Sequence, residues 1–134
     1  METRPAVAPQ DISIDLPDAR LGGALTIPEG ARGMVLFAHG SGSSRHSPRN
    51  RYVAEVLHQA GLGTLLMDLL TREEDAVDQY TRQHRFDIDL LSGRLSGAID
   101  WLTQQPATRD LPIGLFGAST GAAAALRAAA ARHG

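Results

Sequence analysis

The sequence predicts an α/β fold in which two N-terminal antiparallel strands are followed by three parallel strands joined by crossover helices. Residues 34–38, 64–67 and 113–116 are continuous apolar runs, which are typical of strands covered on both faces. Segments with helical spacing of apolar residues lie between these runs. Strands that alternate with helices form right-handed crossovers and a parallel sheet. The 134 residues are enough for one domain with its own core.

The N-terminal part is expected to form the antiparallel pair. Residues 1–10, rich in Pro and Ala, are expected to be a loose arm, and residues 11–134 to form the domain. Residues 11–16 alternate between polar and apolar, as a half-buried strand does. Residues 25–27 follow Gly22 and Gly23 and are interpreted as the antiparallel partner of the first strand.

Two helices are expected between the buried strands. Residues 47–48 are a serine N-cap and a first-turn proline, and the helix that they begin ends at Gly61. Asp87 caps a longer helix, which Pro106 terminates. The apolar residues of the longer helix recur at helical spacing: Leu91, Leu95, Ala98, Ile99 and Leu102.

The remaining segments are a polar stretch and an alanine-rich end. Residues 71–85 are strongly polar and are expected to form an exposed excursion, although residues 71–74 have the pattern of a capped helix start. The acidic residues at 73–75 and 78 are interpreted as a solvated face, so we expect no metal site there. Residues 122–131 contain eight alanines and predict a helix that lies close to the sheet.

The composition excludes several kinds of chemistry. The chain has no cysteine, and all 13 of its Lys and Arg residues are Arg. It therefore lacks a thiol nucleophile, a cysteine-ligated metal, a Schiff-base lysine and a P-loop lysine. The net charge of -2 gives no reason to expect nucleic acid or a membrane as a partner. With no apolar run near 18 residues, we expect a cytoplasmic protein whose partner is a small molecule.

The sharpest motif joins the last apolar strand to the alanine-rich helix. A G-x-S-x-G sequence stands there in a strand–turn–helix setting and consists of Gly117, Ala118, Ser119, Thr120 and Gly121. Small residues allow the chain to bend sharply there and to expose the Ser119 hydroxyl as a nucleophile. The Thr120 amide at the helix N-terminus is then placed to stabilise an oxyanion. The alternative is an ordinary turn in which Ser119 is the helix N-cap.

A second motif follows the first buried strand. His39, Gly40 and Ser41 begin a glycine- and serine-rich loop at the carboxyl end of that strand, where α/β sheets place their ligands. The Ser41 amide is the favoured second oxyanion donor, and His39 and Gly40 are expected to shape the loop. The alternative is an anion-cradling loop, because residues 45, 49 and 51 are arginines.

Together these motifs resemble the α/β-hydrolase superfamily, specifically its dienelactone-hydrolase-like branch. The resemblance covers nearly the whole chain from about Asp11, and its most specific parts are residues 36–44, 49–50, 68–71, 86–88 and 116–121. The resemblance implies a serine hydrolase that acts on esters or related acyl compounds without a cofactor, with Ser119 as the nucleophile. Dienelactone hydrolases proper use a cysteine nucleophile, and this chain has no cysteine. We therefore do not expect it to act on the particular substrate of those enzymes.

The sequence departs from the family after the nucleophile. In the family the triad runs Ser, then Asp or Glu, then His. Only fifteen residues follow Ser119, with no carboxylate and with His133 as their one histidine. A helix of about thirteen residues spans roughly 20 Å, so His133 cannot reach Ser119. We therefore expect the N-terminal portion of such an enzyme, lacking the last three strands and inactive alone. His39 and Asp68 are an alternative base and acid at the same sheet edge.

Two further expectations concern interactions. If the sheet lacks strands beyond residues 113–116, that strand is an exposed apolar edge through which the chain would self-associate. The competing functional interpretation is a non-catalytic module that keeps the sheet and the Ser119 turn to bind an anion or a small acyl ligand.

Overall fold

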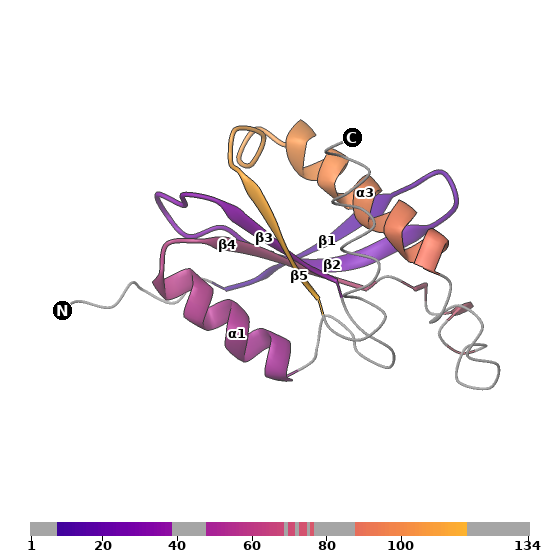
Figure 1. Cartoon of the computed structure of the whole chain (residues 1–134), viewed down its shortest axis with the longest axis horizontal. Coiled ribbons are helices and arrows are strands. Elements are labelled where there is room, and N and C mark those ends of the chain that lie inside the picture. Colours follow the sequence, from indigo (N-terminus) through magenta and orange to yellow (C-terminus); the bar gives the residue numbers. More distant parts are fainter. Residues whose placement is uncertain are drawn as a thin grey trace.

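The computed structural model describes residues 8–38, 48–68, 70–71, 73–74, 76 and 88–117. The elements are β1 (Gln10–Asp15), β2 (Arg20–Thr26), β3 (Met34–Ala38), α1 (Pro48–Gln59), β4 (Gly63–Met67), α3 (Ile88–Gln104) and β5 (Ile113–Gly117). The strands form one five-stranded sheet in the order β1-β2-β4-β3-β5 (Figure 1). This arrangement confirms the predicted fold class.

The first two strands form an antiparallel hairpin. In its tight turn the Leu16 amide donates to the Ala19 carbonyl at 2.8 Å. The prediction that the second strand begins after Gly22 and Gly23 is wrong, because β2 starts at Arg20 and includes both glycines. A Cβ atom at Gly23 would lie 3.1 Å from Leu65 Cδ1, so the missing side chain allows β4 to pack closely at this point.

The three apolar runs form the parallel part of the sheet, as predicted. β3 lies between β4 and β5 and is parallel to both. The two helices lie on opposite faces of the sheet, α1 on one and α3 on the other (Figure 1). Met34, Leu36 and Phe37 of β3 are buried, which explains why this strand has no polar alternation.

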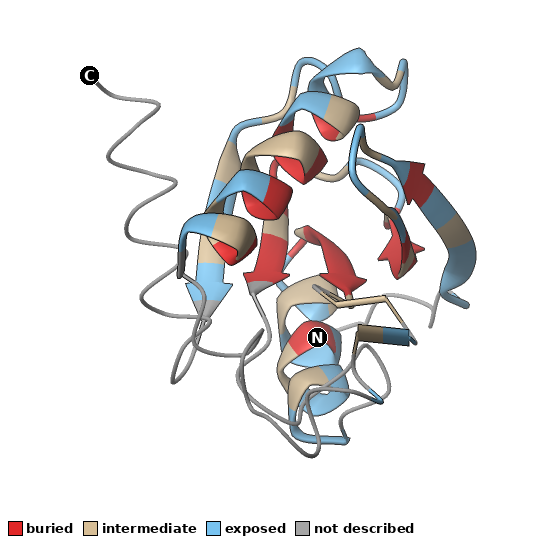
Figure 2. Cartoon of the chain, turned by 90° about the vertical axis from the view of Figure 1, so that its right-hand side faces the viewer, coloured by how far each residue is buried: buried red, intermediate tan, exposed pale blue. Residues whose placement is uncertain are grey.

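The core is divided by the sheet into a large and a small cluster. The large cluster joins α3 to the sheet, and Figure 2 shows the buried positions of α3 facing the strands. It includes all the residues predicted for the apolar stripe: Leu91, Leu95, Ala98, Ile99 and Leu102. The small cluster lies under α1 and consists of Ala24, Phe37, Ala54 and Leu66.

The helix limits also follow the predicted signals where they are described. After α1, Gly61 adopts a left-handed conformation with φ 87°, which glycine tolerates better than other residues. The Leu62 amide then donates to the Leu57 carbonyl at 3.0 Å and closes the helix end. Residues 1–7, the caps at Ser47 and Asp87, and the predicted helix at 122–131 lie outside the described residues.

Candidate functional site at the carboxyl edge of the sheet

Most of the predicted site residues lie outside the described part of the chain. These are His39, Gly40, Ser41, Ser119, Thr120 and Gly121. Gly117 is described as the last residue of β5, and Ala38, which precedes His39, is the last residue of β3. The structure therefore gives the positions from which both predicted loops start, and the roles assigned to their residues stay predictions.

The register of the parallel strands brings these two starting points together. Ala38 is paired with Gly117 across β3 and β5, and Phe37 with Phe116. On the other side of β3, Ala38 is paired with Met67 of β4. The carboxyl ends of all three strands thus meet at one edge, with Asp68 directly after Met67. This neighbour order places the starts of both motifs side by side.

An aromatic pair supports the two strand ends from the α1 face. The ring centroids of Phe37 and Phe116 lie 4.9 Å apart, with an angle of 43° between the ring planes. Phe37 is 1% exposed, whereas Phe116 is 39% exposed. Phe37 and Phe116 are each the next-to-last residue of their strand. Their contact therefore couples the ends of β3 and β5, just before His39 and Ala118.

Asp68 lies at this edge and is held by its backbone. Its amide donates to the Gly22 carbonyl at 2.9 Å, which extends the antiparallel pairing of β4 with β2 beyond Met67. The side chain is half-buried. The sequence-based alternative of a His39–Asp68 pair thus has its acid at the correct edge, while its histidine is outside the described residues.

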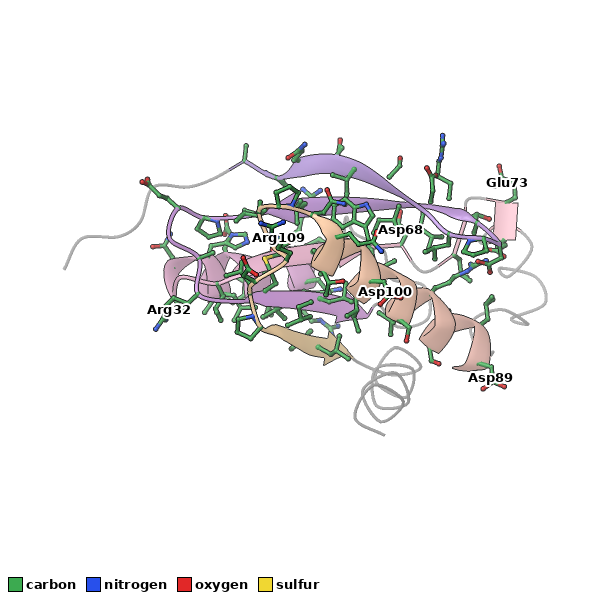
Figure 3. The ribbon with its side chains drawn as sticks, turned by 90° about the horizontal axis from the view of Figure 1, so that it is seen from above. Arg32, Asp68, Glu73, Asp89, Asp100 and Arg109 are labelled. Carbon is green, nitrogen blue, oxygen red and sulfur yellow. The ribbon has the colours of Figure 1, made fainter. Side chains whose placement is uncertain are left out.

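The segment after Asp68 contains the predicted capped turn. The Thr71 amide donates to Glu74 Oε1 at 2.9 Å, and the Glu74 amide donates to Thr71 Oγ1 at 3.1 Å. These reciprocal bonds are those of a capping box. Glu73 is exposed and points outward at the end of the molecule where α3 begins near Asp89 (Figure 3).

Glu74 corrects the expectation that this acidic run is simply a solvated face. Its two carboxylate oxygens accept hydrogen bonds from Arg94 of α3, at 2.5 Å from Nη1 and 2.8 Å from Nη2. The Arg94 side chain is 2% exposed and that of Glu74 24%. The hydrogen bonds from Arg94 lower the pKa of Glu74 from 4.5 to about 2, against the opposing effect of burial.

Arg94 is not among the residues predicted from the sequence, although a signal for it was present. Arg94 lies beside Leu91 and Leu95 on the apolar stripe of α3, where a charge must be paired to be buried. A lone arginine at a stripe position therefore predicts an acidic partner. Which carboxylate serves could not be read from the chain, because several acidic residues are nearby in sequence.

The described residues contain neither a cluster that could bind a metal nor a helix that could span a membrane. Within those ranges, no group of three or more His, Cys, Asp or Glu side chains could hold a metal ion. The helices described are also too short or too polar to cross a membrane.

Solved structures that are similar to this chain include a hydrolase and an esterase. The chain is similar to a dienelactone hydrolase from Anabaena variabilis, with 62% identity and a TM-score of 0.89, over 94% of this chain and 59% of that one. In sequence and fold the chain thus resembles the dienelactone-hydrolase-like branch of the α/β-hydrolase superfamily. An esterase from Pyrococcus furiosus is 25% identical with a TM-score of 0.71, over 90% of this chain and 46% of that one.

Sequence comparison finds two relatives that carry a different kind of name. Two curated proteins from strains of Mycobacterium tuberculosis are 55% identical over 126 residues, which is 94% of this chain. Both are named "Putative phosphoribosyl transferase", and the chain spans 28% of their length. No family model matches the chain. The name therefore refers to proteins most of whose length lies outside the match.

Proposed function

We propose that the chain carries the nucleophile and oxyanion part of a serine hydrolase that acts on an ester or related acyl substrate. The observation that supports this most directly is the pairing of Ala38 with Gly117 at the carboxyl edge. It makes the loop that begins at His39 and the turn that contains Ser119 start from neighbouring backbone positions. Nucleophile and oxyanion donors must converge on one acyl carbon, and neighbouring strand ends allow that.

In the proposed reaction the Ser119 oxygen attacks the acyl carbon while a histidine takes the hydroxyl proton. The negative charge that develops on the acyl oxygen is stabilised by the Ser41 and Thr120 amides, each worth about 3 kcal/mol in comparable sites. The alcohol leaves with the proton, and water then releases the acid from the acyl-enzyme. No metal or organic cofactor takes part in these steps.

The proposed reaction needs a base that activates Ser119, and the residues after Ser119 offer few candidates for it. Residues 120–134 contain no carboxylate, and His133 is their one histidine. An unactivated serine is a weak nucleophile at neutral pH. We therefore expect little turnover from these 134 residues by themselves, and the activity proposed is that of a protein in which a base and an acid reach Ser119.

The test is covalent labelling of Ser119 by an alkyl fluorophosphonate, located by peptide mass spectrometry. It is made on the 134-residue chain and on a chimera in which the part of the Anabaena dienelactone hydrolase beyond the match is fused after Gly134. We expect strong labelling of the chimera, lost in Ser119→Ala and kept in Ser13→Ala, a control at an exposed serine of β1.

Absence of Ser119 labelling in both polypeptides would refute the hydrolase assignment. Binding of the probe without a covalent bond, measured by calorimetry, would then favour the non-catalytic module. Hydrolysis of p-nitrophenyl acetate by the chimera, abolished in Ser119→Ala, would add turnover to the labelling result.

A further inference from the structure

Arg94 is a buried charge that the proposed acyl transfer does not use. Its side chain is 2% exposed, and it lies among the apolar residues of α3 that cover the sheet. A buried guanidinium is strongly destabilising unless its charge and its donors are matched. The way in which Arg94 is matched therefore shows which parts of the chain it holds.

Two separate segments supply carboxylates to Arg94. Glu74, from the capped turn after β4, accepts from both Nη1 and Nη2. Asp18, from the turn between β1 and β2, accepts through Oδ2 from Nη2 at 3.2 Å and from Nε at 3.4 Å. One side chain thus ties together three segments, and the turn that holds Asp18 has no helix or strand structure at that position.

All three segments lie at the end of the sheet that carries the candidate site. β4 ends at Met67, level with Ala38 of β3. β2 runs antiparallel to β4, so the turn that holds Asp18 is at the carboxyl end of β4. The contact of α3 with this turn is close, because a Cβ atom at Gly97 would lie 2.5 Å from Leu16 Cδ2.

The turn held by Glu74 is connected directly to the site edge. Glu74 is seven residues after Met67, and its capping partner Thr71 is only three residues after Asp68. Leu70, between them, packs partly against the large core cluster. Fixing Glu74 and Thr71 therefore restricts where the backbone from Asp68 to Thr71 can lie beside the strand ends.

We propose that Arg94 and Glu74 are positioning residues, which fix the segment from Asp68 to Thr71 as a wall of the acyl-binding site. This inference rests on the proposed function, because the wall matters only if an acyl group binds at this edge. Arg94 does not touch the reacting atoms and acts through Glu74. Its loss should therefore weaken binding of the acyl group more than it slows the attack by Ser119.

The experiment compares Arg94→Met, Glu74→Gln and the conservative Arg94→Lys with the control Asp15→Asn. Asp15 also forms an ion pair, with Arg20 at 2.6 Å, but its side chain is 70% exposed and that of Arg20 73%. Amide hydrogen exchange of residues 68–74 is measured on the 134-residue chain. The rate of Ser119 labelling is measured as a function of fluorophosphonate concentration, which gives the half-saturating concentration and the maximal rate. It is measured in the 134-residue chain or in the chimera, whichever is labelled when it carries no substitution.

We expect exchange at residues 68–74 to quicken at least tenfold in Arg94→Met and Glu74→Gln, with no change in Asp15→Asn. The half-saturating probe concentration should rise about tenfold in the same two variants while the maximal rate changes less than threefold, and Arg94→Lys should recover part of both effects. Labelling is read well below each variant's melting temperature, so that loss of folded protein does not enter.

A purely structural role would lower the melting temperature of Arg94→Met and leave exchange at 68–74 and both labelling constants of the folded protein as in wild type. That result would overturn the positioning role. If wild type is not labelled in either polypeptide, the proposed function fails, and the exchange measurement still decides whether Arg94 holds the segment. In that case the role of the segment as a wall of an acyl site fails with the proposed function, unchanged exchange would also refute the fixing of the segment by Arg94, and faster exchange would support that fixing alone.

Discussion

Acid should weaken the fold through Glu74, and the size of the effect follows from its contacts. The hydrogen bonds from Arg94 lower the pKa of Glu74 from 4.5 in the unfolded chain to about 2 in the folded protein. The folded state therefore binds fewer protons than the unfolded state between these two values. The stabilisation is complete above pH 4.5 and is lost as the pH falls from 4.5 to 2.

The magnitude has an upper limit that the exposure of the pair reduces. One pKa unit corresponds to about 1.4 kcal/mol, so the interval from 4.5 to about 2 gives at most about 3.4 kcal/mol. The Glu74 side chain is 24% exposed and Arg94 also has Asp18 nearby. Solvent screening at the exposed side should reduce the measured contribution to about 2 kcal/mol.

The assay is urea unfolding at a series of pH values from 2 to 7, for wild type, Glu74→Gln and the exposed control Asp15→Asn. The quantity of interest is the difference in unfolding free energy between wild type and Glu74→Gln. This difference should be constant from pH 5 to 7 and shrink by about 2 kcal/mol towards pH 2. Subtraction removes the titration of the other carboxyl groups, provided that the variant keeps the fold by circular dichroism.

A difference between wild type and Glu74→Gln that does not change with pH would refute this account. So would an equally pH-dependent difference for Asp15→Asn, because an exposed pair should contribute little. In either case the hydrogen bonds of Glu74 would not be a source of acid-sensitive stability.

Three other predictions concern packing and association. Gly93→Ala should stabilise the protein by about 0.5–1 kcal/mol, because nothing lies within 4 Å of a Cβ atom at this position. Gly97→Ala, one turn later in α3, should destabilise the protein, because its Cβ atom would meet Leu16. Equal effects of the two substitutions on thermal unfolding would contradict this prediction. Phe37→Ala should lower the unfolding free energy by about 3–5 kcal/mol, and a loss below 1 kcal/mol in urea would contradict the assigned burial. Self-association through β5 should appear in sedimentation velocity and diminish in Gly114→Lys, and a monomeric wild type would exclude it.

The backbone of the site could be predicted because its signals are local. Continuous apolar runs identified β3, β4 and β5, and alternation with helices predicted their parallel order, which the pairing of Ala38 with Met67 and Gly117 confirms. The capping box at Thr71 was also readable, because its partners are three residues apart.

Contacts between distant segments could not be read in this way. Arg94 and Asp18 are 76 residues apart, and no spacing rule connects a hairpin turn to a helix face. The start of β2 was misplaced for a related reason. Glycine has low strand propensity, and the close packing against Leu65 that favours Gly23 in the strand exists only after β4 has formed.

The buried charge of Arg94 is informative because it is an expensive way to hold a segment. An apolar side chain at a helix stripe position would stabilise the core without desolvating a guanidinium, and replacing buried ion pairs by apolar residues is often neutral or stabilising. Apolar contacts, however, are non-directional and tolerate sliding. The two parallel hydrogen bonds from Arg94 to Glu74 define distance and orientation together. Under the proposed function, a segment beside the reacting serine needs that definition more than it needs added stability, which is why we propose that Arg94 serves the site and not only the core.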